Sequence, residues 1–309
     1  MTQRSTQPLS TWDDICFYVR DEMARYVSRF VTPISLANSS DYGTAHATGN
    51  YLSLRSSTYL QTNEHVVRGA MGCDLAHLPG PTDDYVLCNQ EWHTVPWPTD
   101  LAWMKLRAVP AGPSRDSVPA SRLGIRYAPV PQELLFWIGF PGSTAKRHDP
   151  VTERNIRRTW FGSLETPASP VSTQELPTAP TNLRLFDQER HVALHYPAAA
   201  LRTAGQPPIH TPHAKGMSGS LLWDTKFVAN ARLGKEWNVG SAEVCGVLWA
   251  AYARPEVVVA TKVEYIRSAL LRFLRHEAAY FHWINRGRPP FDALSDWLGA
   301  EQSILDLDQ

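Results

Sequence analysis

The chain has 309 residues, of which 43% are hydrophobic and 19% charged, which is enough for roughly two domains of ordinary globular composition. Thirty basic and thirty acidic side chains give a formal net charge of zero, which excludes the global basic excess of many nucleic-acid-binding proteins. The longest uncharged apolar run, residues 244–253, is about half as long as a membrane span, so no transmembrane helix is predicted.

An amphipathic helix is predicted within the N-terminal segment, residues 1–30. The string TWDD at 11–14 is typical of a capping box, and apolar side chains then recur at helical spacing, at Ile15, Val19, Met23, Val27 and Phe30. Such a helix could bind a partner, or it could pack on the main body of the protein, and packing is the favoured interpretation.

Short β-like runs separated by turn residues follow from residue 31. A first set lies at 31–36, 51–54, 59–62, 85–88 and 101–106. A second set lies at 134–140, 156–164, 183–186, 191–196, 220–223, 242–249 and 257–263. Regular short strands without intervening helices favour barrels or sandwiches over a parallel α/β sheet.

The remaining segments complete the predicted organisation. Residues 109–119 read as a linker, and residues 165–181, rich in Pro, Ser and Thr, read as a surface loop. A second helix is predicted from one apolar face, formed by Val263, Ile266, Leu270, Phe273 and Leu274, and a further short helix around 291–298. The predicted units are a helical segment at 1–30, β-units at 31–125 and 126–265, and a helical extension at 266–309.

The cysteines and the N-terminus predict a reducing location. Cys16, Cys73, Cys88 and Cys245 are widely spaced, without a CxxC pair or zinc-type spacing, so neither a disulfide scaffold nor a structural metal is indicated. The N-terminal residues lack the continuous apolar stretch of a secretory signal. We therefore expect a cytoplasmic protein with no cofactor and no membrane partner.

Three short strings carry residue types that act together in nucleophilic catalysis. TNEHVV contains His65, PTDLAWMKL contains Asp100, and KGMSGSLLW contains Ser218. A serine hydroxyl needs a base to remove its proton, and histidine can take that proton and return it to a leaving group. A buried carboxylate fixes the imidazole tautomer. Gly216 and Gly219 permit a tight turn whose backbone N–H groups can point at a developing oxyanion.

These strings resemble those of the chymotrypsin/trypsin-like serine peptidases, and they are closer to the bacterial, cytoplasmic type of this family than to the secreted digestive type. TNEHVV, DLAWMKL and GMSGS match the family's TNxHV, DxAxxKL and GxSGS in the same chain order. IGFPGS at 138–143 resembles a turn of the second barrel, and CGVLW at 245–249 resembles the strand beside bound substrate. The resemblance covers about residues 31–270.

The resemblance implies an all-β fold of two six-stranded barrels, with helical extensions at both ends and the active site between the barrels. It assigns His65 as general base, Asp100 as the orienting carboxylate and Ser218 as nucleophile. The backbone N–H groups of Gly216 and Ser218 would form the oxyanion hole.

Some positions depart from the family pattern. Met217 stands where the digestive enzymes have the aspartate that pairs with a newly cleaved N-terminus, so that route of activation is not expected. The pocket-lining positions would be Pro212, His213, Leu248, Trp249 and Ala250, with Ala251 beside them. Pro212 replaces the aspartate that selects Lys or Arg. Cleavage after an apolar residue, or after an acidic one paired with His213, is therefore expected.

Other sites are less well supported by the sequence. The α/β-hydrolase elbow requires G-x-S-x-G, whereas Ser220 stands at its last position and the histidine comes first in the chain. His276 and His282 are not at the i, i+4 spacing of a metalloprotease helix. A loose group of histidines could bind metal, although strand and loop positions explain it better: His191, His195, His210 and His213.

The favoured function is a serine endopeptidase acting on protein or peptide substrates, with regulation through a protein partner at the terminal helices. A regulated effector or activator protease in a bacterial defence or stress pathway is an extension of that hypothesis. The alternative is a catalytically weak trypsin-like fold that serves as a protein-binding or scaffold module. No nucleic-acid partner is expected in either case.

Overall fold

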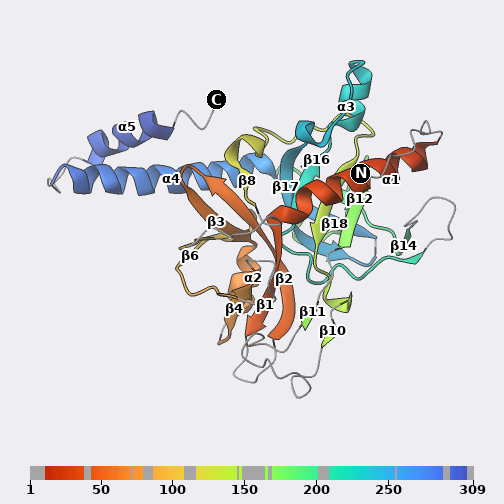
Figure 1. The fold of residues 1–309 in the computed structure, drawn as a ribbon, viewed down its shortest axis with the longest axis horizontal. Helices are drawn as coiled ribbons and strands as arrows, with labels where there is room; N and C mark the ends of the chain where they lie inside the picture. Colours follow the sequence, from red (N-terminus) through yellow and green to blue (C-terminus); the bar gives the residue numbers. More distant parts are fainter. Residues whose placement is uncertain are drawn as a thin grey trace, which may run out of the picture.

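The chain folds into two curled β-sheets that lie side by side, with helices at both ends of the sequence, as the computed structural model in Figure 1 shows. The structure describes residues 11–37, 43–70, 72–78, 86–107, 116–144, 146–147, 164–165, 169–200, 209–254, 256–287 and 293–304.

The first sheet has eight described strands in the order β5-β4-β1-β2-β3-β7-β6, with β8 beside β2. Their bounds are β1 Val31–Ala37, β2 Gly43–Leu54, β3 Ser57–Thr62, β4 Asp74–His77, β5 Val86–Leu87, β6 Trp92–Val95, β7 Leu101–Lys105 and β8 Val118–Pro119. Neighbouring strands are antiparallel except for β2 and β8, which are parallel. The sheet exceeds the six strands expected because it includes two further strands of two residues each, β5 at one edge and β8 beside the end of β2.

The second sheet has six strands in the order β12-β9-β16-β17-β18-β13. Their bounds are β9 Leu135–Gly139, β12 Ser169–Thr173, β13 His191–His195, β16 Leu221–Asp224, β17 Glu243–Tyr252 and β18 Val257–Lys262. The two ends of this sheet meet just after β12, where Leu176 N–H donates to Ala193 O at 3.0 Å and His195 N–H donates to Gln174 O at 3.2 Å. These bonds join the first strand in the order to the last and curl the sheet toward a barrel. The expected chymotrypsin-like double-barrel architecture is thereby confirmed.

Shorter elements complete the described part of the fold. Two small antiparallel ladders pair β10 (Lys146–Arg147) with β11 (Leu164–Glu165), and β14 (Ala199–Ala200) with β15 (Ile209–His210). Two helices of six residues, α2 (Glu64–Gly69) and α3 (Phe227–Arg232), lie in connections between strands.

Strand β9 is buried on both faces, which explains why its sequence is continuously apolar rather than alternating. Leu135 and Trp137 pack in the core of the second sheet, whereas Phe136 and Ile138 pack in the core that contacts the terminal helices. Because successive side chains of a strand point to opposite faces, two cores on opposite sides demand an apolar residue at every position.

The N-terminal helix α1 (Trp12–Val27) packs on the body of the protein. It begins with the predicted capping box, in which Asp14 N–H donates to Thr11 Oγ1 and Thr11 N–H donates to the Asp14 carboxylate, both at 3.1 Å. Val19, Met23 and Val27 are buried in the shared core. The packing interpretation of this helix is therefore the one that the structure supports.

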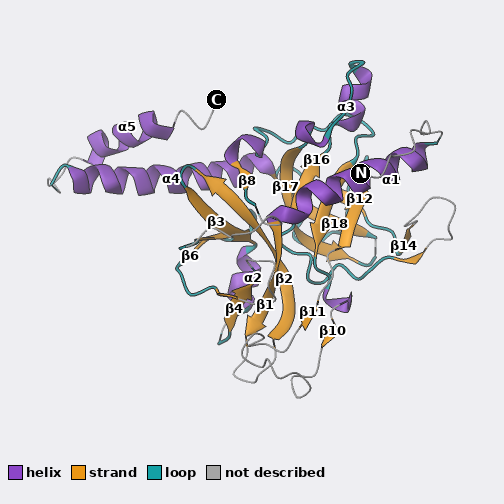
Figure 2. Cartoon of the chain, in the orientation of Figure 1, coloured by secondary structure: helices purple, strands orange, loops and turns teal. Residues whose placement is uncertain are grey.

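The C-terminal helix α4 (Val263–Asn285) follows β18 directly and runs from the shared core out past the first sheet (Figure 2). Its buried side chains are Val263, Ile266, Leu270, Leu274 and Ala278. Helix α5 (Ala293–Ile304) folds back along α4, and Arg286 Nε donates to the Asp296 carboxylate at 2.9 Å between them. In the described part of the chain, no helix has the length and apolar character needed to cross a membrane.

Several predicted segments differ from the structure. The loop expected at 165–181 contains strand β12, which has few large apolar residues but pairs with β9 through its backbone. The predicted strand at 183–186 is instead a series of turns. Most of the predicted strand at 156–164 and of the linker at 109–119 lies outside the described residues.

Candidate active site

His65 lies at the start of helix α2, immediately after strand β3 ends. Asn63 is the N-cap of this helix and has extended backbone, so the chain turns sharply from strand into helix at the TNEH string. His65 is the second helical residue, and its side chain is 38% exposed. The position leaves the imidazole accessible to a ligand from solvent.

Asp100 holds His65 through both carboxylate oxygens. His65 Nδ1 lies 2.6 Å from Asp100 Oδ2, and the backbone N–H of His65 donates to Oδ1 at 2.9 Å. The Asp100 side chain is only 5% exposed. Because an ionised carboxylate can only accept, the proton of a neutral imidazole must sit on Nδ1. Nε2 is therefore left as the proton acceptor that a general base requires.

Asp100 adopts left-handed backbone, with a φ of 50°. A residue other than glycine pays about 1–3 kcal/mol for such a conformation, so the surrounding contacts must hold it. Its N–H donates to Pro96 O at 3.2 Å, and its carbonyl accepts from Asn63 Nδ2 at 2.7 Å. Asn63, within the TNEH string but not singled out by sequence, thus ties the segment of Asp100 to that of His65.

Ser218 lies in a tight turn that is bonded to the first sheet. Thr48 N–H of β2 donates to Ser218 O at 2.9 Å, and Asn50 Nδ2 donates to Gly219 O at 2.7 Å. Thr48 O in turn accepts from Thr62 Oγ1 at 2.9 Å, at the end of the strand that leads to His65. These bonds bring the serine turn beside the start of α2. No hydrogen bond links Ser218 to His65 in the described residues.

The peptide units around Ser218 orient the two candidate oxyanion-hole groups. Lys215 O accepts from Gly142 N–H at 2.8 Å, and Met217 O accepts from Ser220 N–H at 3.1 Å. In a trans peptide the N–H points away from the carbonyl, so the N–H groups of Gly216 and Ser218 are turned away from these partners. Neither N–H donates a hydrogen bond within the described part of the chain, which leaves both available to a ligand.

Both glycines of the serine turn have left-handed backbone, with φ values of 98° at Gly216 and 94° at Gly219. A Cβ on Gly216 would lie 2.6 Å from Phe140 O, in the predicted IGFPGS turn. A Cβ on Gly219 would lie 2.2 Å from Thr48 O. The turn therefore needs glycine at both positions, for its backbone conformation and for its close approach to neighbouring backbone.

Replacing Gly219 with alanine is expected to lower the free energy of unfolding by more than about 2 kcal/mol, because left-handed strain adds to a collision with backbone. Gly234→Ala is the matched control, since Gly234 also has a positive φ (64°) but has no atom within 4 Å of the added Cβ. It should cost about 1 kcal/mol. Urea denaturation of both variants checks this, and equal losses would contradict the packing argument.

A pocket of about 190 Å³ opens beside Ser218. It is lined by His213, Ala214, Lys215, Met217, Ser218, Leu248, Trp249, Ala250, Ala251 and Val258. The structure thus places four of the five predicted substrate-binding residues around it. The fifth, Pro212, is outside this lining, and its carbonyl accepts from Tyr196 Oη at 2.6 Å. No carboxylate is present in the described lining, and buried Met217 contributes a thioether instead.

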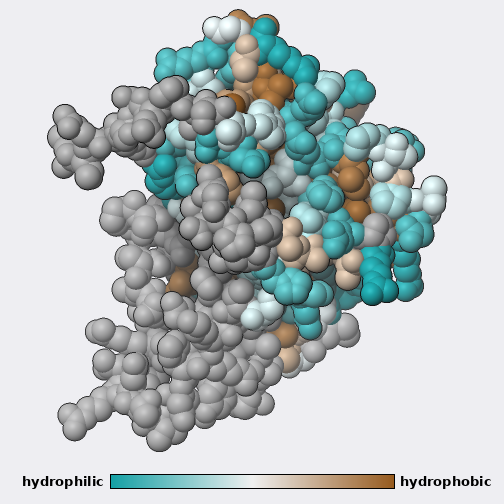
Figure 3. All heavy atoms as spheres, turned by 90° about the vertical axis from the view of Figure 1, so that its right-hand side faces the viewer, coloured by the Kyte–Doolittle hydropathy of each residue, from teal (hydrophilic) through white to brown (hydrophobic). Residues whose placement is uncertain are grey.

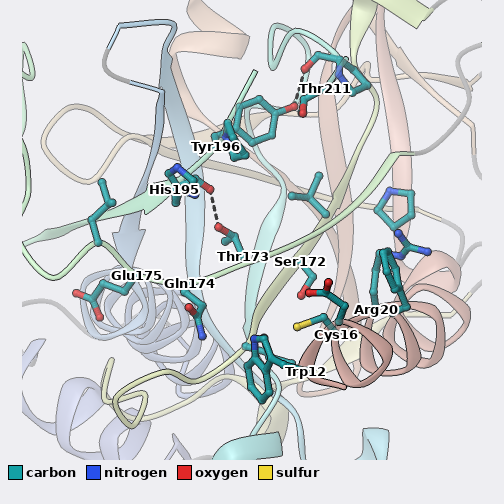
Figure 4. A pocket seen from close by; sticks show the side chains of 18 of the residues that line it. Trp12, Cys16, Arg20, Ser172, Thr173, Gln174, Glu175, His195, Tyr196 and Thr211 are labelled. Atoms are coloured by element: carbon teal, nitrogen blue, oxygen red, sulfur yellow. Dashed lines mark hydrogen bonds between the residues drawn. The ribbon is translucent and has the colours of Figure 1, made fainter. Parts of the chain in front are cut away.

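A larger pocket of about 650 Å³ lies between α1, β12 and the segment around Pro212 (Figure 4). Trp12, Cys16 and Arg20 of α1 face Thr173, His195 and Tyr196 across it. Burial raises the pKa of Cys16 to about 11, so this thiol is protonated at neutral pH and is a poor nucleophile. On the side of the molecule seen in Figure 3, the described residues are largely hydrophilic, with smaller hydrophobic areas between them.

The four histidines of the loose group occupy separate environments. His191 is buried, whereas His195, His210 and His213 are exposed. Three of the four contact different backbone groups through a ring nitrogen: His191 contacts Pro98 O, His210 contacts Ala198 O and His213 contacts Lys215 N–H. Across the described residues there is no group of three or more His, Cys, Asp or Glu side chains that could hold a metal ion.

Two histidines outside the predicted triad, one buried and one half-buried, are expected to make stability depend on pH. Burial lowers the pKa of His191 and of His46, the latter bonded through Nε2 to Val66 O at 2.9 Å. Below the ordinary histidine pKa of about 6.5, these two side chains bind more protons in the unfolded chain than in the folded one. The free energy of unfolding should therefore fall as the pH drops below about 6.5. Urea denaturation between pH 5 and 8 checks this, and an equally steep pH dependence in His191→Gln would contradict the part assigned to His191.

Two comparisons with known proteins give matches. A family described as "Protein of unknown function (DUF2934)" matches residues 276–306, a segment that includes the end of α4 and all of α5. No curated protein matches the chain. Among solved structures, the active form of the Rv3671c protease from M. tuberculosis has 15% sequence identity and a TM-score of 0.43, covering 87% of this chain and 92% of that chain. A similarity at this level does not extend to the activity.

Proposed function

We propose that this chain is a serine endopeptidase that hydrolyses peptide bonds through His65, Asp100 and Ser218, in the manner of the trypsin-like peptidases it resembles. The observation that carries the proposal is the His65–Asp100 pair, whose 2.6 Å contact leaves Nε2 as a proton acceptor beside a serine turn that is bonded to the same sheet. The backbone N–H groups of Gly216 and Ser218 would donate hydrogen bonds to the oxyanion that forms during acyl transfer.

The proposed reaction proceeds in two balanced steps. Ser218 Oγ attacks the carbonyl carbon of the scissile bond while His65 Nε2 takes the hydroxyl proton, and the carbonyl oxygen becomes an oxyanion facing the N–H groups of Gly216 and Ser218. The C–N bond then breaks, the imidazolium protonates the leaving amine, and the acyl group remains on Ser218. A water molecule then attacks the ester carbonyl while His65 takes its proton, the carboxylic acid product leaves, and the imidazolium returns the proton to Ser218 Oγ. Throughout, the Asp100 carboxylate stabilises the positive charge on the imidazole.

The pocket beside Ser218 supports cleavage after small or medium apolar residues. Its described lining is mainly apolar and holds no carboxylate to pair with a bound Lys or Arg, and Lys215 at its edge would repel either. Burying an unpaired cation costs several kcal/mol. In a proteome-derived peptide library, we expect cleavage after Ala, Val, Leu or Met to exceed cleavage after Lys or Arg at least tenfold. Cleavage chiefly after Lys or Arg would contradict this assignment.

A reducing, cytoplasmic setting and external control of activity belong to the same proposal. In the described residues the four cysteines form no disulfide, and Cys245 is buried within the second sheet. Met217, with 1% exposure, packs in that core and offers no carboxylate to a new N-terminus. Control by a protein partner at the exposed end of α4 and α5, as in an effector or activator protease, is the form of regulation that we favour.

A protein-binding module that lacks efficient turnover is the second candidate. The observation in its favour is that Ser218 and His65 are not hydrogen-bonded in the described structure. A fluorophosphonate probe separates the two functions, because it reacts only with an activated serine. Labelling of the wild type at Ser218, identified by peptide mass spectrometry and absent in Ser218→Ala, supports the peptidase. Absence of labelling in the folded wild type favours the binding module.

A further inference from the structure

The loop that carries Asp100, residues 96–100, is held by the second sheet. Pro98 O lies 2.7 Å from His191 Nε2 at the start of β13, and Thr99 O accepts from Thr261 Oγ1 of β18 at 3.1 Å. Trp97 Nε1 also donates to Leu185 O at 3.2 Å. Three successive residues of this loop are therefore bonded to the second unit, while the next residue, Asp100, serves His65 of the first.

His191 uses both ring nitrogens in this contact. Its Nδ1 accepts from the backbone N–H of Asp187 at 3.0 Å, so in the neutral ring the proton must sit on Nε2, which donates to Pro98 O. His191 is 1% exposed, and its ring centroid lies 5.0 Å from that of Trp249, which lines the pocket beside Ser218. Burial, the dominant effect, lowers the pKa of His191 and keeps the ring in this neutral form, with Asp187, Arg190 and Lys262 as the charged groups around it.

Asp100 depends on such contacts because its own backbone conformation is unfavourable. With a φ of 50°, the residue would relax toward ordinary backbone if its loop were released, and the carboxylate would turn with it. Asn63 Nδ2 holds the Asp100 carbonyl from the first unit at 2.7 Å, and the bond from Asp100 N–H to Pro96 O lies within the loop. The bonds at Pro98 and Thr99 add anchors from the second unit, two residues and one residue before Asp100.

We propose that His191 is a positioning residue for the triad: by holding Pro98 O from the second sheet, it keeps the Asp100 carboxylate on His65. The inference rests on the proposed function of the triad. In this proposal the contact between the two units contributes to catalysis, because a side chain of the second unit keeps a carboxylate of the first unit in place.

Two substitutions of nearly equal polarity separate this role from simple packing. His191→Gln retains an amide N–H that reaches Pro98 O, whereas His191→Asn can still accept from Asp187 N–H but is too short to reach Pro98. The rate of fluorophosphonate labelling of Ser218 should fall about 10- to 100-fold in His191→Asn, because sub-ångström misplacement of a catalytic group is costly. His191→Gln should retain most of the rate. His195→Leu, an exposed position on the same strand, is the matched control and should label as the wild type does.

The proton shared by His65 and Asp100 provides a readout that does not depend on turnover. A short Nδ1–H to carboxylate bond gives a far-downfield proton resonance, which should move upfield or broaden in His191→Asn and persist in His191→Gln. An unchanged resonance and labelling rate in His191→Asn would overturn the inference. If His191→Asn does not fold, Thr261→Val, which removes only the bond to Thr99 O, tests the other anchor of the same loop and should show the same changes to a smaller degree. Wild-type behaviour would then refute the anchoring of Asp100 through this loop, on which the inference rests. Failure of the wild type to label would refute the proposed function alone, because the resonance would still report the position of Asp100.

Discussion

Replacing Ser218 with alanine is expected to lower peptide hydrolysis by at least about 10⁴-fold without unfolding the protein. The substitution removes the hydroxyl proposed to form the acyl-enzyme, while the backbone N–H groups at positions 216 and 218 and the pocket beside them stay in place. A residual acceleration of about 10³-fold over water should therefore remain, from oxyanion stabilisation and binding. Hydrolysis of fluorescently labelled casein measures the loss.

The control for this experiment is Ser121→Ala, since Ser121 is an exposed serine in a short 3₁₀ turn (Ala120–Arg122) remote from the site. It should hydrolyse casein at the wild-type rate, and both variants should unfold at the wild-type urea concentration. Comparable casein hydrolysis by Ser218→Ala and the wild type would refute the assignment of the nucleophile. New protein N-termini that appear in cells with the wild type but not with Ser218→Ala would then identify physiological substrates.

Asp100→Asn is expected to lower turnover by about 10³- to 10⁴-fold while leaving the shape of the site almost unchanged. The two carboxylate oxygens accept from the backbone N–H and from Nδ1–H of His65, whereas asparagine has one oxygen and one NH₂ group. If the oxygen keeps the backbone N–H, the NH₂ group faces Nδ1 and favours the tautomer with the proton on Nε2. That tautomer cannot accept the proton of Ser218, and the charge that stabilises the imidazolium is also lost.

Glu133→Gln is the matched control for the loss of a buried carboxylate. Glu133 is 3% exposed and accepts from the N–H groups of Val228 and Ala229 at the start of α3, and it has no hydrogen bond to the three candidate residues in the described structure. We expect it to lower the free energy of unfolding by about 1–3 kcal/mol with little change in turnover. Equal losses of casein hydrolysis in the two variants would show that Asp100 acts only through stability.

The part of the candidate site that the sequence predicts lies in short strings, in which each candidate residue has neighbours of characteristic type. His65, Asp100 and Ser218 were each found from a few neighbours in sequence, because a strand end, a helix start or a glycine-flanked turn is a local structure. Thr48 and Asn50 carried no such signal, since an Asn or Thr in a strand is ordinary. Their importance arises only when β2 meets the serine turn, more than 160 residues later in the chain.

The same contrast applies to the fold. The capping box of α1 and the apolar face of α4 were visible because helix periodicity is local. Strand β12 was missed because its sequence, SPVST, is polar and resembles a loop, while pairing with β9 stabilises it as a strand through backbone bonds. Such long-range pairing leaves little trace in composition.

The amino-acid sequence by itself determined the order and type of the candidate groups: an imidazole, a carboxylate and a hydroxyl, each placed at the end of a local element, in a chain without net charge. Tertiary structure alone decided which nitrogen of His65 is free, which N–H groups face outward, and which side chains hold Asp100 in a strained conformation. The physical reason is that residue type sets what a group can donate or accept, whereas direction depends on contacts between segments far apart in the chain. His191 is the clearest case, because it is one strand residue among many until Pro98 packs against it.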